Sequence, residues 1–561
     1  MLELSLVKGA CDSPLLDHTI GRHFDFVCSS HPDRLAVISR HQRVRWSFAE
    51  LKERVDATAS GLLALGLRKG DRVGIWAPNC WEWLVTQYAT AKAGLILVTI
   101  NPAYRKAEVE YALNKVECKA LVVAPRHKSS EYLEMLTDLA PELATALPGQ
   151  LCANRLPSLR TIITLGVAQY PGCLRFKDLL TAGTDEHRRV LDELSAQLTC
   201  DEPINIQFTS GTTGAPKGAT LSHRNILNNA RYVGNAIRLG PEDRLCTPVP
   251  LYHCFGMVMA NLGCLTHAAC VVYPAEAFEA LAVLSAVEEE KCTTLYGVPT
   301  MFIAMLSHAE FGRFDLSGLR TGIMAGSPCP IAVMRQVIDR MHMSEVTIAY
   351  GMTETSPVSF QSSTDDPLEK RVTTVGRIQP HLEVKVIDSA GNLVPRGTPG
   401  ELCTKGYSVM LGYWGEPTLT ADVVRDGWMY TGDLATLDAQ GYCNIVGRIK
   451  DMVIRGGENI YPREIEEFLY RHPAVQDVQV VGVPDRKYGE ELCAYFIVKA
   501  GCELSEEELR VFCRDQIAHY KVPKYVRFVE SFPTTVSGKV QKFKLREALI
   551  AELALVTDAT A

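Results

Sequence analysis

One segment of the sequence combines glycine, hydroxyl and lysine residues in a pattern suited to holding phosphate. It reads TSGTTGAPKG over residues 209–218 and directly follows the apolar run 204–208. Glycines let backbone N–H groups approach phosphate oxygens, the hydroxyls add donors, and the lysine supplies a cation. Because Pro216 precedes the lysine and Gly218 follows it, this is not the G-x-x-x-x-G-K-[ST] loop. The residues expected to hold phosphate are Thr209, Ser210, Gly211, Thr212, Thr213, Gly214 and Lys217.

Two further segments carry side chains that could bind a nucleotide and a metal. Tyr350 ends an apolar strand and could stack on a purine, while Thr353 offers a hydroxyl to an α-phosphate. Glu354 offers a carboxylate to Mg²⁺, which prefers oxygen ligands, and Asp433 could accept from two ribose hydroxyls. Taken alone, Glu354 is more often a solvated carboxylate at a helix start, and Asp433 more often belongs to an Asx turn.

A histidine and a lysine complete the set of candidate catalytic residues. Lys539 follows Gly538 in a loop from which a long side chain could reach into a cleft, although exposed lysines are usually solvated. His253 lies in a stretch without Asp, Glu, Lys or Arg between Arg244 and Glu276, where a core histidine is an equal alternative. That stretch is long enough to span a membrane, but its prolines, histidines and glycines favour a buried strand-loop-helix-strand.

These side chains need strands and helices that bring them together. Short apolar runs alternate with amphipathic helical patterns at 48–65 and 102–115, which predicts α/β layers with largely parallel sheets. Ligands in such sheets usually lie where strands end and loops begin. The predicted strands are residues 72–76, 96–100, 120–123, 161–164, 204–208, 270–273 and 346–350.

The pattern of residue types changes twice toward the C-terminus. After residue 376, short β segments separated by turns predict a compact β subdomain. Beyond 447–450 the pattern predicts a small α+β unit, in which Ser505 would cap a helix. The predicted elements of this unit are helices at 464–470 and 505–517 and strands at 475–483 and 492–498.

Composition argues against several classes of protein. The 561 residues are 47% hydrophobic and 22% charged, which predicts a large buried core rather than a disordered chain. A net charge of −7 argues against nucleic acid as the main partner. The 18 cysteines include no C-x-x-C pair for zinc or redox chemistry. The first residues show no signal or transit peptide pattern, so the cytoplasm is the expected location.

A family resemblance rests on five motifs that follow one another along nearly the whole chain. The chain resembles the acyl-adenylate-forming superfamily, which includes acyl-CoA synthetases, adenylation domains and luciferases. The GGENIYP run makes the similarity greatest to the medium-chain acyl-CoA synthetase branch. The motifs are the loop 209–218, YGMTE at 350–354, YTGD at 430–433, GRIKDMVIRGGENIYP at 447–462 and SGK at 537–539.

The resemblance implies two domains joined by a hinge. It implies an N-terminal AMP-binding domain over residues 1–448, with layered α/β sheets and a β subdomain at about 376–446. A small mobile α+β domain would occupy residues 449–561 and rotate about Lys450. Many relatives carry Asp at the hinge, but Lys also occurs in the family.

The resemblance also assigns roles to individual residues. Lys539 would bridge carboxylate and phosphate during adenylation, Arg448 would contact the nucleotide, and His253 would lie near the carboxylate of the acyl substrate. Gly456 and Gly457 would border the path of the CoA pantetheine. The residues expected along the adenine, ribose, α-phosphate and metal are Gly326, Ser327, Tyr350, Gly351, Thr353, Glu354 and Asp433.

The implied reaction is the AMP-forming ligation of a carboxylic acid to CoA through acyl-AMP, with ATP, Mg²⁺ and CoA required. The uncharged segment offers no acid to pair with an amino group, so a medium-chain fatty acid is expected rather than an amino acid. The expected partners are therefore small molecules, with no nucleic acid and no transmembrane segment. The expected assembly is a monomer or a homodimer.

Several alternatives stay open. Within the superfamily, the protein could stop at acyl-AMP, load a separate carrier protein, or act on branched or aryl acids. A nucleotide-binding regulator with a decayed site is disfavoured because every motif position is intact. A membrane transporter rests only on the uncharged segment.

Overall fold

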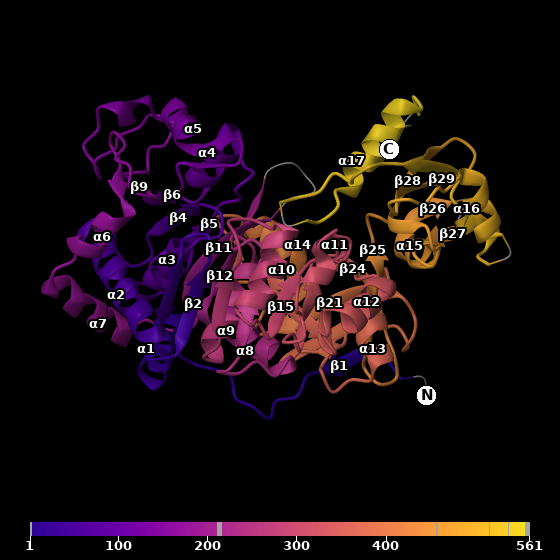
Figure 1. Ribbon diagram of the computed structural model, residues 1–561, viewed down its shortest axis with the longest axis horizontal. Helices are drawn as coiled ribbons and strands as arrows, with labels where there is room; N and C mark the ends of the chain where they lie inside the picture. The colour runs from indigo at the N-terminus through magenta and orange to yellow at the C-terminus, as the bar shows by residue number, and fades with distance from the viewer. Residues whose placement is uncertain (1–2, 210–215, 456–457, 515, 537, 556–561) are drawn as a thin grey trace.

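Two large sheets form the body of the protein in the computed structural model, which describes residues 3–209, 216–455, 458–514, 516–536 and 538–555 (Figure 1). Over these residues one sheet has eight strands and the other nine, and most neighbouring strands are parallel. The eight-stranded sheet runs β10 (Leu174–Arg175), β9 (Thr161–Thr164), β6 (Ala120–Val123), β4 (Arg72–Trp76), β5 (Ile96–Thr99), β11 (Pro203–Thr209), β12 (Lys217–Ser222) and β22 (Gly412–Tyr413). The nine-stranded sheet runs β19 (Arg377–Ile378), β18 (Val358–Gln361), β17 (Glu345–Gly351), β16 (Thr321–Ala325), β15 (Thr294–Gly297), β13 (Arg244–Cys246), β14 (Cys270–Tyr273), β2 (Leu35–Ser39) and β3 (Val44–Ser47).

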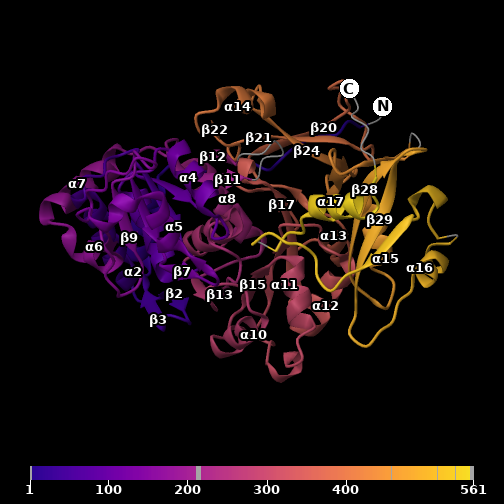
Figure 2. The same cartoon turned by 90° about the horizontal axis from the view of Figure 1, so that it is seen from above.

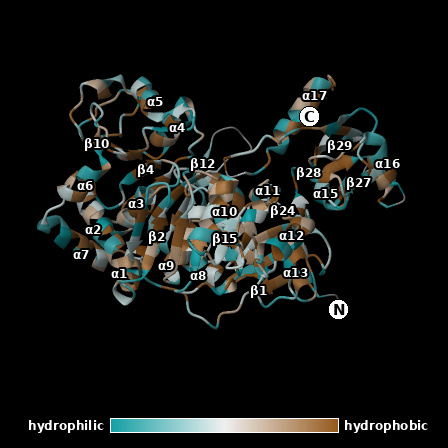
Figure 3. Cartoon of the chain, viewed as in Figure 1, coloured by the Kyte–Doolittle hydropathy of each residue, from teal (hydrophilic) through white to brown (hydrophobic). Residues whose placement is uncertain are grey.

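Helices cover these sheets because each presents an apolar side to them. Phe48, Leu51 and Val55 of one such helix are almost fully buried, and a capping box between Ser47 and Glu50 fixes where that helix begins. In Figure 3 the apolar colour gathers on the strands, while the polar colour lies mostly on outward helix faces and loops. The helices of this body include α1 (Ile20–Ser30), α2 (Phe48–Ala64), α3 (Trp81–Lys92), α4 (Lys106–Lys115), α8 (His223–Ala236), α10 (Ala280–Glu289), α11 (Pro299–Leu306) and α12 (Ile331–Met341).

The predicted α/β architecture is confirmed, and the differences are local. The helix predicted from residue 102 begins at Lys106, because Asn101 first closes a turn by accepting from the backbone N–H groups of Ala103 and Tyr104. The helix predicted over 505–517 is α16 (Glu506–Cys513), capped by Ser505 as expected but shorter.

The uncharged segment folds as a buried strand, loop, helix and strand. It leaves β13, passes through the π-helix η2 (Phe255–Leu262) and α9 (Gly263–Thr266), and returns as β14 beside β13. The π-helix is a feature that the sequence pattern did not predict. Within the described ranges, no helix is both long enough and apolar enough to cross a membrane.

A third sheet, of six strands over the described residues, is antiparallel. It includes β1, whose residues Leu6, Val7 and Lys8 pair with β20, so the start of the chain joins the predicted β subdomain. Its strands are β1 (Leu6–Lys8), β20 (Leu382–Ile387), β21 (Gly400–Gly406), β24 (Trp428–Leu437), β23 (Val424–Arg425) and β25 (Cys443–Arg448).

The C-terminal unit has its own sheet and apolar core. Val478, Leu492 and Phe496 are among the buried residues of that core. Figures 1 and 2 show the unit at one end of the molecule, with the yellow segment between β30 and α17 reaching back toward the large sheets. Its elements are β26 (Val453–Arg455), β27 (Glu458–Ile460), α15 (Pro462–Leu469), β28 (Val475–Asp485), β29 (Gly489–Val498), α16, β30 (Tyr525–Phe528) and α17 (Lys542–Glu552).

Candidate active site

The predicted phosphate-binding loop joins two neighbouring antiparallel strands. Thr209 ends β11 and Lys217 begins β12, and the two residues face each other in the register of the pair. The Thr209 hydroxyl lies 3.5 Å from the carbonyl oxygen of Lys217. Both ends of the loop are therefore fixed by the sheet. Five predicted phosphate ligands lie outside the described residues: Ser210, Gly211, Thr212, Thr213 and Gly214.

Glu354 lies beside both ends of this loop. It belongs to the short helix η4 (Thr353–Thr355) after β17, and only 6% of it is exposed. Its Oε1 accepts from the hydroxyl of Tyr413 at 2.9 Å and from that of Thr209 at 3.4 Å. The Lys217 ammonium lies 5.2 Å from the centre of the Tyr413 ring. Tyr413 therefore links the predicted metal ligand to the predicted phosphate cation.

Tyr413 was missed by the sequence reasoning. It belongs to no predicted motif and reaches the site only because β22 pairs with β12. Gln207 was missed as well, although it lies in an otherwise apolar strand, two residues before Thr209 and so on the same side of β11. A polar side chain in an apolar strand just before the phosphate loop could have identified Gln207 as a candidate site residue.

A second cluster contains the predicted ribose ligand. Asp433 is 7% exposed and accepts from the hydroxyl of Tyr350 at 2.6 Å. The Nε of Arg448 lies 3.2 Å from the other carboxylate oxygen, since Arg448 faces Asp433 across β24 and β25. Burial, together with the Asp433 charge, raises the pKa of Tyr350 well above its ordinary value. Each carboxylate oxygen has a second lone pair, so ribose hydroxyls can still be accepted.

Lys539 reaches this cluster from the C-terminal unit. Its ammonium interacts electrostatically with Arg448 and Asp433, and also with His253 of the uncharged segment. Burial and the charge of Arg448 lower the pKa of Lys539 to about 8, against opposing effects of Asp433 and Asp451. A residue of the C-terminal unit is therefore close enough to residues of the N-terminal part to interact with their charges, and the predicted bridging lysine retains a titratable charge near neutral pH.

The loop that carries Lys539 contacts the N-terminal part of the protein directly. The carbonyl oxygen of Gly538 accepts from the hydroxyl of Thr300, in α11, at 3.3 Å. Gly538 has φ +81°, and an added Cβ would lie 2.8 Å from Val298. A larger residue would therefore both strain the backbone and push the loop away from α11.

His253 is neutral at physiological pH in this environment. Burial lowers its pKa to about 4, and the charge of Lys539 acts in the same direction. Its Nδ1 accepts from the backbone N–H of Phe255 at 3.2 Å, which assigns the ring proton to Nε2 as a donor. The histidine is thus a positioned neutral hydrogen-bond donor.

The thiol of Cys254, in the uncharged segment, contacts residues near the predicted nucleotide site. It donates to Oε1 of Gln207 at 3.0 Å. Burial raises its pKa to about 12, and a hydrogen bond with Thr353 opposes that rise. The thiol is therefore protonated, and Thr353 lies next to the predicted acyl side of the site. The amide of Gln207 contacts the sulfur of Met257 at 2.9 Å.

Two predicted glycines occupy backbone positions that other residues would not fit. Gly326 follows β16 with φ +90°. Gly351 ends β17, and a Cβ there would lie 1.7 Å from the carbonyl oxygen of Pro357. Ser327 follows Gly326 and is half-buried. Because β16 and β17 are parallel neighbours, these residues lie along the same edge of the sheet as Tyr350.

The predicted hinge residue Lys450 lies in an exposed turn between β25 and β26. Backbone N–H groups of Asp451 and Met452 donate to the carbonyl of Arg448 and close this turn. The two predicted CoA-path residues, Gly456 and Gly457, lie outside the described residues.

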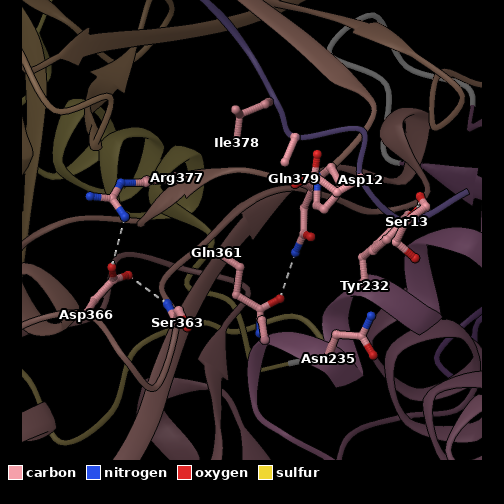
Figure 4. A pocket seen from close by; sticks show the side chains of 13 residues that line it. Asp12, Ser13, Tyr232, Asn235, Gln361, Ser363, Asp366, Arg377, Ile378 and Gln379 are labelled. Atoms are coloured by element: carbon pink, nitrogen blue, oxygen red, sulfur yellow. Dashed lines mark hydrogen bonds and ion pairs between the residues drawn. The ribbon is translucent and has the colours of Figure 1, made fainter.

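A cavity of about 380 Å³ lies apart from these residues (Figure 4). It is enclosed by α8, by β18 and β19, and by the N-terminal arm at Asp12 and Ser13. Its polar wall includes Arg377, 3.5 Å from Asp366, and Gln379, which donates to Gln361 at 2.9 Å. None of the predicted site residues lines it, so it is distinct from the candidate active site.

The chemistry of the assembled side chains suits a nucleotide triphosphate and a carboxylic acid. Lys217, Arg448 and Lys539 supply positive charge, and Thr209 and Thr353 supply hydroxyl donors. In the described part of the chain, no group of three or more His, Cys, Asp or Glu could hold a metal. Glu354 with its neighbouring hydroxyl nonetheless fits Mg²⁺, which usually takes one or two carboxylates plus phosphate oxygens and water.

Comparisons with known proteins match nearly the whole chain. The AMP-binding enzyme family matches residues 24–414, and the C-terminal domain of AMP-binding enzymes matches residues 464–539. The medium-chain acyl-CoA ligase ACSF2, mitochondrial, of Danio rerio is 48% identical over 560 residues, covering 99% of this chain and 92% of its own.

Two solved structures extend the comparison to three dimensions. The anthranilate CoA ligase AuaEII in complex with anthranoyl-AMP is 28% identical with a TM-score of 0.85, covering 97% of this chain and 99% of its own. ATP-bound MatB from Rhodopseudomonas palustris is 30% identical with a TM-score of 0.79, covering 94% of this chain and 98% of its own. Two family matches along the sequence and a full-length relative lead to one conclusion: the chain belongs to the AMP-binding enzyme family.

Proposed function

We propose that this protein is an AMP-forming acyl-CoA synthetase that activates medium-chain fatty acids. In the first half-reaction, a carboxylate oxygen attacks the α-phosphorus of ATP and the bond to pyrophosphate breaks. In the second, the sulfur of CoA attacks the carbonyl carbon of acyl-AMP, the thiol proton passes to solvent, and AMP leaves. A carboxylate is a poor electrophile. Its conversion to acyl-AMP makes the carbonyl carbon reactive, because AMP is a good leaving group.

The observation that carries the proposal is the position of Lys539. Its ammonium comes from the C-terminal unit and interacts electrostatically with Arg448 and Asp433 and with His253. A cation there would neutralise both the substrate carboxylate and the α-phosphate as they approach, and it would hold them in line. The Nε2 proton of His253 would orient the carboxylate without adding charge.

The remaining residues would bind ATP and its metal. Lys217, Thr209 and the loop that follows would hold the phosphates, Thr353 the α-phosphate, and Asp433 the ribose. Glu354 would hold Mg²⁺, which neutralises phosphate charge when bound. Gly326, Ser327, Tyr350 and Gly351 would line the adenine. CoA would be the thiol acceptor, with its pantetheine beside Gly456 and Gly457.

The acyl substrate is proposed from the wall of the site and from the relatives. Phe255 and Met257 belong to a segment without charged side chains, and the Danio rerio relative is named a medium-chain acyl-CoA ligase. Each methylene buried against such a wall favours binding by about 0.8 kcal/mol. Aryl acids are the alternative, because AuaEII, an anthranilate CoA ligase, has the same fold.

The test is CoA-dependent AMP formation across acids from acetate to palmitate, with branched acids, benzoate and glutamate included. kcat/KM should rise with chain length to a maximum at medium length. A maximum at acetate or glutamate would contradict the pocket assignment, and one at benzoate would favour the aryl alternative. Acyl-AMP formation without thioester formation would favour an acyl-AMP ligase or a carrier-protein acceptor.

Location and assembly are part of the same proposal. We infer a cytoplasmic enzyme from the sequence, whereas the Danio rerio relative carries the name of a mitochondrial protein. Fractionation of the native cell would decide between these compartments. A monomer or homodimer is proposed, and light scattering of the purified protein would test it.

A further inference from the structure

The C-terminal unit touches the N-terminal part of the protein at a second place, distant in sequence from Lys539. The guanidinium of Arg463, in the first turn of α15, donates to the carbonyl oxygen of Ile445 in β25 at 2.8 Å. In Figure 1, α15 lies between the rest of its own unit and the region of β25 and α12. Arg463 also interacts electrostatically with the thiol of Cys329, in the loop that leads into α12.

Glu467 lies one turn after Arg463 on the same face of α15. Its carboxylate accepts from the backbone N–H of Ile331, the first residue of α12. Burial raises the pKa of Glu467, and the charge of Arg463 and this hydrogen bond oppose the rise. The contact therefore joins a half-buried carboxylate of one unit to a helix N-terminus of the other.

Helix α12 has no capping side chain and no negative charge of its own at its N-terminus. Its N-cap residue is Pro330, which makes no side-chain capping bond, and its first turn contains no acidic residue. The first N–H groups of a helix need acceptors, and a negative charge there is favourable. Glu467, from the C-terminal unit, provides both an acceptor and a negative charge. The same α12 follows the segment containing Gly326 and Ser327, so the docking point adjoins the predicted adenine wall.

The other two carboxylates of α15 stay within the C-terminal unit. Glu464 pairs with Lys521 at 2.5 Å, and Glu466 pairs with Lys542 at 2.6 Å and accepts from the backbone N–H of Val480. Of the three glutamates that follow one another along this helix, Glu467 is thus the one that reaches across to α12. The helix itself supplies a matched control for its role.

We propose that Glu467 and Arg463 are positioning residues that dock α15 on α12 and β25, and so hold the C-terminal unit in the orientation that brings Lys539 into the active site. This inference rests on the proposed function, because the orientation matters for the adenylation half-reaction. Release of this docking would then precede the CoA step, since the unit must turn before another of its faces can approach the acyl carbonyl.

The first test separates the two half-reactions in Glu467→Ala. Pyrophosphate release from ATP and octanoate should fall about 10- to 150-fold, the scale of losing one hydrogen bond to a charged group. Thioester formation from supplied octanoyl-AMP and CoA should stay within about twofold of wild type or rise, because the undocked population grows. Arg463→Ala should show the same split, and Glu467→Gln, which keeps an acceptor but loses the charge, should lie in between.

Glu464→Ala is the matched control and should leave both half-reactions within about twofold. If Glu467→Ala slowed both half-reactions equally, or neither, the positioning role would be overturned. A second readout does not depend on activity: amide hydrogen exchange at the start of α12 should become faster in Glu467→Ala and stay unchanged in Glu464→Ala. Unchanged exchange in both variants would also overturn the docking.

These outcomes are distinguishable from failure of the proposed function. A wild-type protein that released no pyrophosphate with any carboxylic acid would contradict the synthetase proposal. The exchange measurement would still decide whether Glu467 docks on α12.

Discussion

Lys539 shows how a single residue acquires a function through its surroundings. It is one of many lysines in the sequence, yet it is half-buried, and its charge interacts with Arg448, Asp433 and His253. A long cationic side chain normally keeps its charged end in water, so this position is unusual for a lysine. Its ordinary pKa would leave it charged at any physiological pH, whereas here the charge depends on pH.

Removal of this side chain should separate the half-reactions. In Lys539→Ala, pyrophosphate release should fall by about 10²-fold or more, the scale of losing a preorganised charge partner. Conversion of supplied acyl-AMP to acyl-CoA should remain near the wild-type rate. The exposed Lys544, five residues later, provides the control variant Lys544→Ala, which should be neutral. Equal loss of both half-reactions in a folded Lys539→Ala would contradict the assigned role.

The pKa of Lys539 predicts how adenylation depends on pH. With a pKa of about 8, the ammonium is charged below pH 8 and loses its proton above it. The rate of pyrophosphate release should therefore be level below about pH 7.5 and fall by up to tenfold per pH unit above pH 8. His253, with a pKa of about 4, does not titrate in this range. Lys539→Arg keeps its charge, so a fall that persisted in that variant would belong to another group.

Glu354 gives a prediction about metal dependence. Glu354→Gln can still accept from Tyr413 but loses the charge that would hold Mg²⁺. Pyrophosphate release should be slower, and excess Mg²⁺ should restore part of the rate. Tyr413→Phe keeps the carboxylate and should shift the Mg²⁺ dependence less. Wild-type rates in Glu354→Gln at every Mg²⁺ concentration would remove this residue from the metal site.

At the scale of elements, the site depends on where strands end. β11 and β17 each finish at a predicted site residue, β16 finishes directly before one, and a close backbone approach fixes the end of β17. Gly351→Ala would place a methyl group 1.7 Å from the carbonyl oxygen of Pro357, so the strand end must move. We expect a loss of about 1–3 kcal/mol in stability and slower adenylation.

Gly312→Ala is the control for that change, because a Cβ at Gly312 meets no atom within 4 Å. Thermal unfolding and pyrophosphate release would be measured for both variants. An unchanged melting temperature in Gly351→Ala would mean that the end of β17 can relax without cost.

The strands were the part of the fold most open to prediction. β4, β6, β9 and β14 have the predicted bounds, because buried parallel strands are short apolar runs with turns at both ends. Helix ends were less predictable, as the delayed start of α4 shows, since an Asx turn competes locally with the helix. The sequence does not distinguish the π-helix η2 from an α-helix, because its apolar residues suit both.

The site was predictable where it consists of motifs and not where it depends on packing. Tyr350 and Asp433 were each predicted, but their mutual hydrogen bond joins two different sheets and has no counterpart in local sequence. Tyr413 was missed for the same reason, since only the pairing of β22 with β12 brings it to Glu354. The contact of Thr300 with Gly538 depends on the placement of a whole domain.

At the scale of the whole molecule, the proposed mechanism requires the C-terminal unit to turn about the exposed segment at Lys450. Lys450→Pro fixes φ and removes the backbone N–H at that position, so it should hinder the turn. The structure already brings Lys539 to the site, so pyrophosphate release should change little. Thioester formation from acyl-AMP should be slowed severalfold or more. Slowing of the first step alone would place the hinge elsewhere.

The pairing of β1 with β20 also has a consequence for how the chain is made. Leu6 pairs with Lys385, so about 380 residues must leave the ribosome before the first strand meets its partner, which takes roughly 20–80 s at translation speeds of about 5–20 residues per second. β2 likewise pairs with β14, which is synthesised more than 200 residues later, whereas β4 and β5 are close in sequence and can pair soon after synthesis. Early in biosynthesis, the nascent chain therefore carries strand edges without their partners, and β1 can join the β subdomain only after most of the N-terminal part has been synthesised.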